Sequence, residues 1–224
     1  MFLENGKVRL HYEVSGSGTP LIMLHGSGED ISIFEKALPA LEKHFTVYRI
    51  DTRCHGESGK HVPLHYNLIA DDVYRFIILL ELDKPIVYGF SDGGIAALIL
   101  AYTHPDSIRA IAASGANTNP KALKFLYRIG YGKLSVFHVD PKARMIATEP
   151  NITKEDLQRI KVPALITAGE KDMIKEEDTK KIASSISSSR LLILKGENHS
   201  SYIDGSEKIG AILIDNFTGE NSLI

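Results

Sequence analysis

The chain has one cysteine, Cys54, and no apolar run long enough to span a lipid bilayer. A single cysteine excludes an internal disulfide and provides no cysteine pair for a structural zinc site. The longest apolar stretches, at residues 76–80 and 95–101, fall well short of the ~20 residues that a membrane helix needs. The first residues also lack a basic segment followed by an apolar one, which is the pattern of a secretory signal. We therefore expect a soluble, cytoplasmic protein.

Charge of one sign is scarce as well. Among 224 residues, 26 lysine and arginine residues are balanced by 28 aspartate and glutamate residues, for a formal net charge of −2. A balance this close to zero gives no reason to expect nucleic acid or an anionic membrane surface as a partner. The hydrophobic fraction of 43% is ordinary for a globular protein, and the length suits one domain over residues 1–224.

Segments of strand length alternate with segments of helical periodicity along most of the chain. Runs rich in β-branched and apolar residues predict strands at residues 20–24, 46–50, 85–90, 108–113, 162–168 and 190–194. Apolar spacing of three and four predicts helices at residues 31–44, 66–82, 92–103, 175–187 and 206–217, with Pro39 kinking or dividing the first. Asn5-Gly6 before an alternating segment predicts an opening β-hairpin. The chain is therefore expected to form an α/β fold with a mostly parallel, doubly wound sheet and an antiparallel edge.

One segment, residues 117–150, is longer than a single crossover between strands requires. The spacing of Leu123, Leu126 and Tyr127 favours a small helical lid inserted within the domain. Aromatic residues are frequent here, and we expect four of them to close over a compact apolar or aryl group of a substrate. They are Phe125, Tyr127, Tyr131 and Phe137.

The same segment contains six basic residues, against the two acidic residues Asp140 and Glu149. Such an excess can steer an anionic ligand towards a cleft, through a field that salt weakens. The alternative is a solvated outer face of the lid, because lysines on helices usually point to water. The basic residues are Lys121, Lys124, Arg128, Lys133, Lys142 and Arg144.

The sequence Gly89-Phe90-Ser91-Asp92-Gly93 lies where the strand expected at 85–90 meets the helix expected at 92–103. In a G-x-S-x-G motif at such a junction, the serine sits on a strained turn that exposes its hydroxyl above the sheet. The flanking positions need glycine because a Cβ there would collide with neighbouring backbone. The motif alone also fits an ordinary glycine-rich turn, but its position favours Ser91 as a nucleophile.

A serine hydroxyl is a weak nucleophile and needs a base within hydrogen-bond reach. In an open α/β sheet such partners come from loops at the carboxyl ends of other strands. Asp172 follows the strand expected at 162–168, and His199 follows the strand expected at 190–194. The chain order serine, aspartate, histidine suits this architecture. Glu170 and Asp178 are neighbouring carboxylates, and the alternative for Asp172 is a solvated turn residue.

Together these motifs resemble the α/β-hydrolase family, and the resemblance extends from the first hairpin to the last helix. The motifs are specific to the fold and to the triad, and unspecific to the substrate. Where the family pattern reads Asp-x-Arg-Gly-His-Gly-x-Ser, Cys54 replaces the first glycine, which can alter the local turn. The matching residues are His25-Gly26, Asp51-Thr52-Arg53, Gly89 to Gly93, Gly169 to Asp172 and Asn198-His199.

The resemblance implies an oxyanion hole formed by the backbone N–H groups of Ser27 and Asp92, with His25 ordering the oxyanion loop. It implies an acyl-enzyme mechanism that needs neither a metal nor an organic cofactor.

Three histidines near the fourth strand raise the question of a metal site. They are His55, His61 and His65, and Pro63 breaks the helical spacing of the last two. Solvated loop positions are the stronger interpretation.

The residues therefore predict a serine hydrolase that acts on a small carboxylic ester, with Ser91 as nucleophile, His199 as base and Asp172 as the acid. Epoxide hydrolases and haloalkane dehalogenases of this family resemble it with aspartate at the nucleophile position, so Ser91 argues against both. Carbon–carbon bond hydrolases, lactonases, thioesterases, amidases and perhydrolases stay open as alternatives. So does a receptor that keeps the fold and binds a ligand without turnover.

Overall fold

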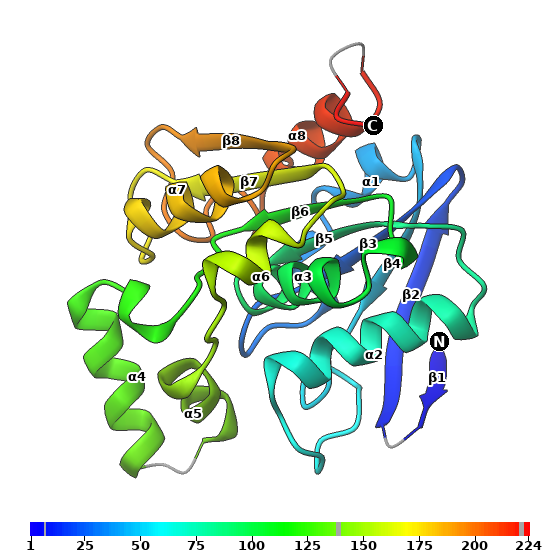
Figure 1. Ribbon diagram of the computed structural model, residues 1–224. Coiled ribbons are helices and arrows are strands. Elements are labelled where there is room, and N and C mark those ends of the chain that lie inside the picture. Colours follow the sequence, from blue (N-terminus) through cyan, green and yellow to red (C-terminus); the bar gives the residue numbers. More distant parts are fainter. Residues whose placement is uncertain (7, 138–139, 220–221) are drawn as a thin grey trace.

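The computed structural model describes residues 1–6, 8–137, 140–219 and 222–224, and its centre is an eight-stranded sheet (Figure 1). The strand order is β1-β2-β4-β3-β5-β6-β7-β8. The hairpin of β1 (Phe2–Asn5) and β2 (Val8–Gly16) is the antiparallel edge, and β2 also pairs antiparallel with β4. The other strands are parallel, as the alternating sequence predicts. They are β3 (Thr19–Leu24), β4 (Phe45–Ile50), β5 (Ile86–Phe90), β6 (Ala110–Ser114), β7 (Ala164–Gly169) and β8 (Ser189–Leu194).

Helices cover both faces of the sheet, and each face has its own hydrophobic core. On one face pack α2 (Tyr66–Leu79), α3 (Asp92–Thr103), α6 (Lys154–Gln158) and α7 (Glu176–Ser185). The other face is covered by η1 (Ile31–Phe34), α1 (Leu38–Leu41) and α8 (Lys208–Phe217). Ten of the residues of α3, from Asp92 to Ala101, are buried. Because these helices and strands hold its two ends, the loop before α3 is fixed on both sides.

Two local differences from the expected elements have clear causes. The helix expected at 31–44 is divided into η1 and α1, and Pro39 lies in the first turn of α1, where its missing N–H costs no hydrogen bond. The short helix α6 has no counterpart among the expected elements. It is set by a capping box in which Thr153 and Asp156 each bond to the other's backbone N–H.

Residues 117–150 are helical, as expected, but they form two helices and a short turn. The turn η3 (Pro120–Ala122) leads to α4 (Phe125–Phe137), and α5 (Pro141–Thr148) follows. The two helices lie beside each other, away from the layers of helices that cover the sheet (Figure 1). Their role as a lid remains a prediction.

The departure from the family pattern at Cys54 has a visible consequence for the backbone. Cys54 has a φ of 65°, in the left-handed region that glycine adopts freely and other residues avoid. The turn that glycine makes in the family pattern is therefore kept here with a side chain present. Two carbonyl oxygens, of Lys60 and Val62, lie 3.3 and 3.4 Å from the Cys54 thiol.

A buried histidine in the same loop makes the fold sensitive to acid. The ring of His55 is 3% exposed, and its Nδ1 lies 2.9 Å from the carbonyl oxygen of Arg53. Burial lowers the pKa of His55 from 6.5 to about 4. The unfolded chain therefore gains a proton at His55 as the pH falls below 6.5, and the folded chain resists it. Stability from this group is complete above pH 6.5 and is lost as the pH falls towards 4.

We expect His55→Asn to weaken the pH dependence of stability between pH 7 and pH 5. Asparagine keeps a donor near the Nδ1 position but does not titrate. The wild-type chain should lose about 2 kcal/mol more than the variant over this range, as measured by urea unfolding at both pH values. Other titrating groups are common to both proteins and cancel in the difference. A difference between the two proteins that is the same at both pH values would contradict the assignment.

Candidate active site

Ser91 lies on the sharp turn between β5 and α3 and has a φ of 51°. Its N–H donates to the carbonyl oxygen of Ser114 on β6 at 2.8 Å. A Cβ on Gly89 would lie 2.0 Å from the carbonyl oxygen of Gly93, and a Cβ on Gly93 would lie 2.4 Å from that of Leu24. Both glycines of the motif are therefore required by close backbone contacts, and the turn holds Ser91 in a strained conformation.

His199 and Asp172 converge on Ser91 from the ends of two further strands. His199 follows β8, and its Nε2 lies 3.1 Å from the Oγ of Ser91. Its Nδ1 lies 2.6 Å from Oδ1 of Asp172, which follows β7. The N–H of Ile174 donates to the same Oδ1 at 2.9 Å and fixes the carboxylate. With Nδ1–H donating to Asp172, Nε2 is the ring nitrogen that can accept the serine proton.

The two neighbouring carboxylates that compete with Asp172 in the sequence lie elsewhere. Glu170 is exposed, and its Oε2 accepts from the N–H of Gly196 at 2.8 Å. Asp178 accepts from the N–H and the hydroxyl of Thr118. Asp172, in contrast, is 3% exposed, and its contact with His199 is the shortest of the three.

Gly115 is a site residue that the sequence reasoning missed. It follows β6, has a φ of 61°, and a Cβ there would lie 2.7 Å from Cε1 and 2.9 Å from Nδ1 of His199. Any side chain at this position would displace the imidazole ring. The signal in the sequence is a glycine directly after a central strand, and it gains meaning only when His199 is placed beside it.

The loop after β3 is ordered by His25, as the family resemblance implies. Its Nε2 accepts from the N–H of Thr52 at 3.0 Å, and its Nδ1–H donates to the carbonyl oxygen of Gly26 at 2.7 Å. Burial lowers the pKa of His25, which keeps the ring neutral and suits both bonds. Glu29 closes the loop by accepting from the N–H of Gly26 at 2.8 Å.

The predicted oxyanion donors, the N–H groups of Ser27 and Asp92, border the same space as Ser91. Hydrogen bonds within the described part of the chain leave both N–H groups unused. Asp92 is the first residue of α3, so its N–H lies at the positive end of the helix dipole. An unused donor of this kind can hold a developing negative charge.

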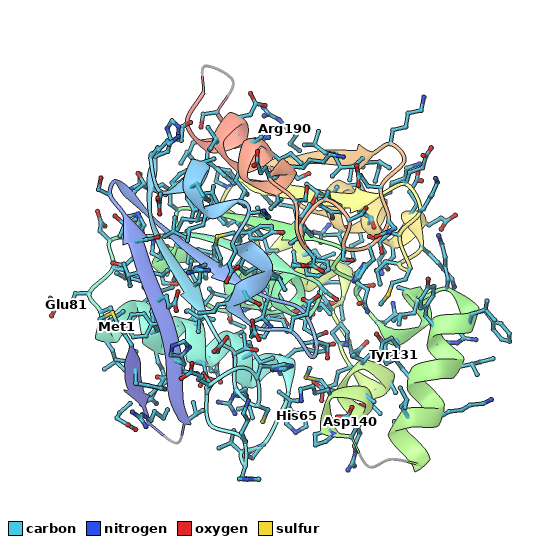
Figure 2. The ribbon with its side chains drawn as sticks, turned by 180° about the vertical axis from the view of Figure 1, so that it is seen from behind. Met1, His65, Glu81, Tyr131, Asp140 and Arg190 are labelled. Carbon is cyan, nitrogen blue, oxygen red and sulfur yellow. The ribbon has the colours of Figure 1, made fainter. Side chains whose placement is uncertain are left out.

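A cavity of about 160 Å³ opens beside the Oγ of Ser91. Tyr131 of α4 contributes to its wall, and Figure 2 shows this residue on the side of α4 near the body of the protein. The other lining residues are Gly26, Ser27, Glu29, Tyr66, Phe90, Ser91, Asp92, Asn117, Leu123, Ile146, Met173, Ile174, His199 and Ser200.

Two of the four aromatic residues expected in the site do not border this cavity, and the expectation for them is corrected. Phe125 is 63% exposed and Tyr127 is 50% exposed. Phe125 lies on another face of α4, and Tyr127 lies one turn, about 6 Å, further along the helix axis from Tyr131. The side chain of Phe137 lies outside the described residues.

The basic residues of the segment 117–150 do not border the cavity either. Five of the six are exposed, and Lys142 is half-buried. This placement matches a solvated outer face of α4 and α5. The two ionisable carboxyl groups at the cavity wall, those of Glu29 and Asp92, have the opposite charge.

The three histidines near β4 are separate in the structure. His55 is buried, His61 is exposed, and His65 contacts Glu149 at the end of α5. Over residues 1–6, 8–137, 140–219 and 222–224, histidine, cysteine, aspartate and glutamate form no group of three or more that could hold a metal ion. No helix in the described part of the chain combines the length and the apolar character needed to cross a membrane.

Comparisons with known proteins agree with this architecture. Residues 19–138 match the model of the alpha/beta hydrolase fold. A soluble epoxide hydrolase of Corynebacterium sp. is 35% identical over 46% of the chain, and the match spans 36% of that enzyme. The serine hydrolase BPHL of Homo sapiens is 31% identical over 74% of the chain and 67% of its own length. The crystal structure of the enol-lactonase from Burkholderia xenovorans LB400 superposes with a TM-score of 0.81 at 21% identity, covering 96% of this chain and 98% of the lactonase. The chain belongs to the α/β-hydrolase fold family.

Proposed function

We propose that the chain is a serine hydrolase that cleaves small carboxylic esters through a covalent acyl-enzyme. One observation carries the proposal: the hydroxyl of Ser91, the imidazole of His199 and the carboxylate of Asp172 form a continuous hydrogen-bonded chain of 3.1 and 2.6 Å. A nucleophile, a base that contacts it and a third group that orients the base are the parts this chemistry requires.

The mechanism follows from these contacts. Ser91 Oγ attacks the ester carbonyl while Nε2 of His199 takes its proton, and the N–H groups of Ser27 and Asp92 hold the oxyanion. The protonated His199 then gives its proton to the leaving alcohol, and an acyl-Ser91 ester forms. A water molecule deprotonated by His199 attacks this ester, and the acid leaves as the Ser91 hydroxyl is restored.

Ser91 also bears on which relatives are useful guides. An aspartate nucleophile forms an ester with an epoxide or an alkyl halide, and a serine alkoxide there would give an ether that water does not hydrolyse. The serine therefore favours acyl transfer over the reaction of an epoxide hydrolase. The enol-lactonase to which the chain is similar by fold is named for another acyl bond, and a lactone substrate remains the second candidate.

Trapping of the nucleophile tests the proposed function. A fluorophosphonate should label the chain with one equivalent of phosphonate, and peptide mapping should place the label on Ser91. With p-nitrophenyl acetate we expect turnover after any initial burst. A receptor that keeps the fold without catalysis would show no release beyond the uncatalysed rate, and that outcome would overturn the proposal.

The size of the cavity predicts selectivity for small acyl groups. A cavity of about 160 Å³ is close to the ~150 Å³ that holds a benzene molecule in a protein core. We therefore expect p-nitrophenyl acetate and butyrate to have kcat/KM values at least about 10-fold above that of the dodecanoate, because a dodecanoyl chain exceeds the cavity. Initial rates on the homologous series at fixed detergent concentration measure this. Highest kcat/KM on chains of twelve carbons or more would contradict it.

A further inference from the structure

Beside the triad, the cavity wall contains a carboxylate that the proposed mechanism does not use. The backbone N–H of Asp92 is a proposed oxyanion donor, but the Asp92 side chain has no part in acyl transfer. It is 5% exposed, and the hydroxyl of Tyr66 donates to its Oδ1 at 2.8 Å. Its Oδ2 is buried and has no hydrogen-bond partner among the described residues. A buried carboxylate oxygen without a partner is costly and calls for a ligand.

A second carboxylate borders the same cavity. Glu29 is half-buried, and one of its oxygens, Oε2, accepts from the N–H of Gly26 at 2.8 Å. Glu29 and Asp92 come from the loop after β3 and from the start of α3, so they reach the cavity from two separate elements. No lysine or arginine is among the described residues of the cavity wall.

The usual structural reason for a buried carboxylate is an ion pair, and none serves here. The ion pairs formed within the described ranges involve neither Glu29 nor Asp92. The nearest ionisable base is His199, whose Nδ1 contacts Asp172 and whose Nε2 contacts Ser91. A position in the first turn of α3 favours an acidic residue at Asp92, but it does not require Oδ2 to face a cavity.

The electrostatic state of the two groups agrees with an unfilled cation site. Burial raises the pKa of Asp92 to about 6, although the hydroxyls of Tyr66 and Ser27 and the nearby His199 lower it. Burial also raises the pKa of Glu29, and the negative charge of Asp92 adds to the rise. A bound cation would relieve both the burial cost and the repulsion between the two carboxylates.

We propose that Asp92 and Glu29 form a cation-binding subsite, and that the natural ester carries a protonated amine close to its carbonyl group. Asp92 directly follows the nucleophile, so a cation held by its carboxylate lies within a few bonds of the carbon that Ser91 attacks. This inference rests on the proposed ester hydrolysis and adds the class of substrate. The charge at the cavity wall also opposes the anionic ligands that the basic residues of segment 117–150 suggest.

Three benzyl esters of matched size test the subsite. In the glycine ester an ammonium group stands where the propionate ester has a methyl group, and the malonate half-ester has a carboxylate there. We expect wild-type kcat/KM to follow the order glycine, propionate, malonate. Asp92→Asn should lower the ratio of glycine to propionate kcat/KM by about 10-fold to 100-fold, since a charge-assisted hydrogen bond becomes a neutral one. Glu29→Gln should lower the ratio by a smaller factor.

The comparison of ratios removes two other causes. Intrinsic reactivity of the glycine ester is the same for every variant and cancels. Damage to the oxyanion donors would lower both esters alike and leave the ratio unchanged. Glu35→Gln, at an exposed position outside the cavity, is the matched control and should leave the ratio at its wild-type value.

Inhibition by a simple amine gives a second measurement that does not depend on turnover of the glycine ester. We expect n-butylammonium to compete with the propionate ester in the wild-type chain, and n-butanol of similar size to compete far less. Asp92→Asn should remove most of this difference. An unchanged glycine-to-propionate ratio in both variants, or preference of the wild-type chain for the malonate half-ester, would overturn the subsite. Hydrolysis of the propionate ester in that case would leave the proposed esterase intact, whereas hydrolysis of none of the three esters would contradict the proposed function itself.

Discussion

Ser91→Ala is expected to lower kcat/KM for p-nitrophenyl acetate by about 10⁴-fold or more. The hydroxyl removed is the atom that lies 3.1 Å from Nε2 of His199, and without it no acyl-enzyme can form. Residual hydrolysis would come from water that His199 activates directly, assisted by the N–H groups of Ser27 and Asp92. Initial rates of p-nitrophenol release, corrected for the uncatalysed reaction, measure the loss.

The folded state should survive this change. Alanine fits the turn, because the Oγ of Ser91 contributes no hydrogen bond to the backbone and contacts His199 alone among its described partners. The melting temperature should therefore stay close to that of the wild-type chain. Ser184→Ala, at an exposed position on α7, is the control for loss of a serine hydroxyl and should keep full activity. Activity of Ser91→Ala above a tenth of the wild-type value would require a different nucleophile.

The central part of the fold and the triad could be predicted from the sequence because their signals are local. A strand, a G-x-S-x-G turn and a helix follow one another within 85–103, and this order alone sets where the hydroxyl emerges. Asp172 and His199 come directly after β7 and β8. Since the carboxyl ends of parallel strands meet at one edge of the sheet, their convergence on Ser91 follows from topology.

Features that depend on how distant segments pack could not be predicted in this way. The need for glycine at position 115 arises from the ring of His199, which is far from it in the sequence. The spacing of aromatic residues in α4 shows which of them share a face, but it does not show which turn of the helix meets the body. The two exposed residues Phe125 and Tyr127 were misplaced for that reason, whereas Tyr131 borders the cavity.

The acidic character of the cavity wall illustrates the same limit. In the sequence, six basic residues between 117 and 150 suggest an electropositive entrance. In the structure they point outwards or lie beside other surfaces, and the charge next to Ser91 comes from Glu29 and Asp92. Charge counted along a segment therefore says little about charge in a site, because helices place most of their charged residues in water.

The second large effect is expected for Asp172→Asn, which should lower kcat by about 10³-fold to 10⁴-fold. In the wild-type chain Oδ1 of Asp172 accepts from both Nδ1–H of His199 and the N–H of Ile174. An asparagine can take two orientations. With its oxygen in the Oδ1 position it keeps both contacts but has no charge to stabilise the imidazolium. With its amide group in that position it opposes two donors and drives the imidazole proton to Nε2, where it blocks the base.

Both orientations thus disable His199 while leaving the Ser91 hydroxyl present, which separates this variant from Ser91→Ala. Asp172→Asn should still react with a fluorophosphonate, but much more slowly than the wild-type chain, and its slow turnover should remain measurable. Glu170→Gln is the matched control, because Glu170 is exposed two residues away and bonds to Gly196 instead of to the imidazole. We expect it to change kcat by less than about threefold, as for other exposed side chains outside a site. If Glu170→Gln showed the large loss and Asp172→Asn the small one, the carboxylate that orients His199 in solution would be Glu170, and the contact at 2.6 Å would not be the working one.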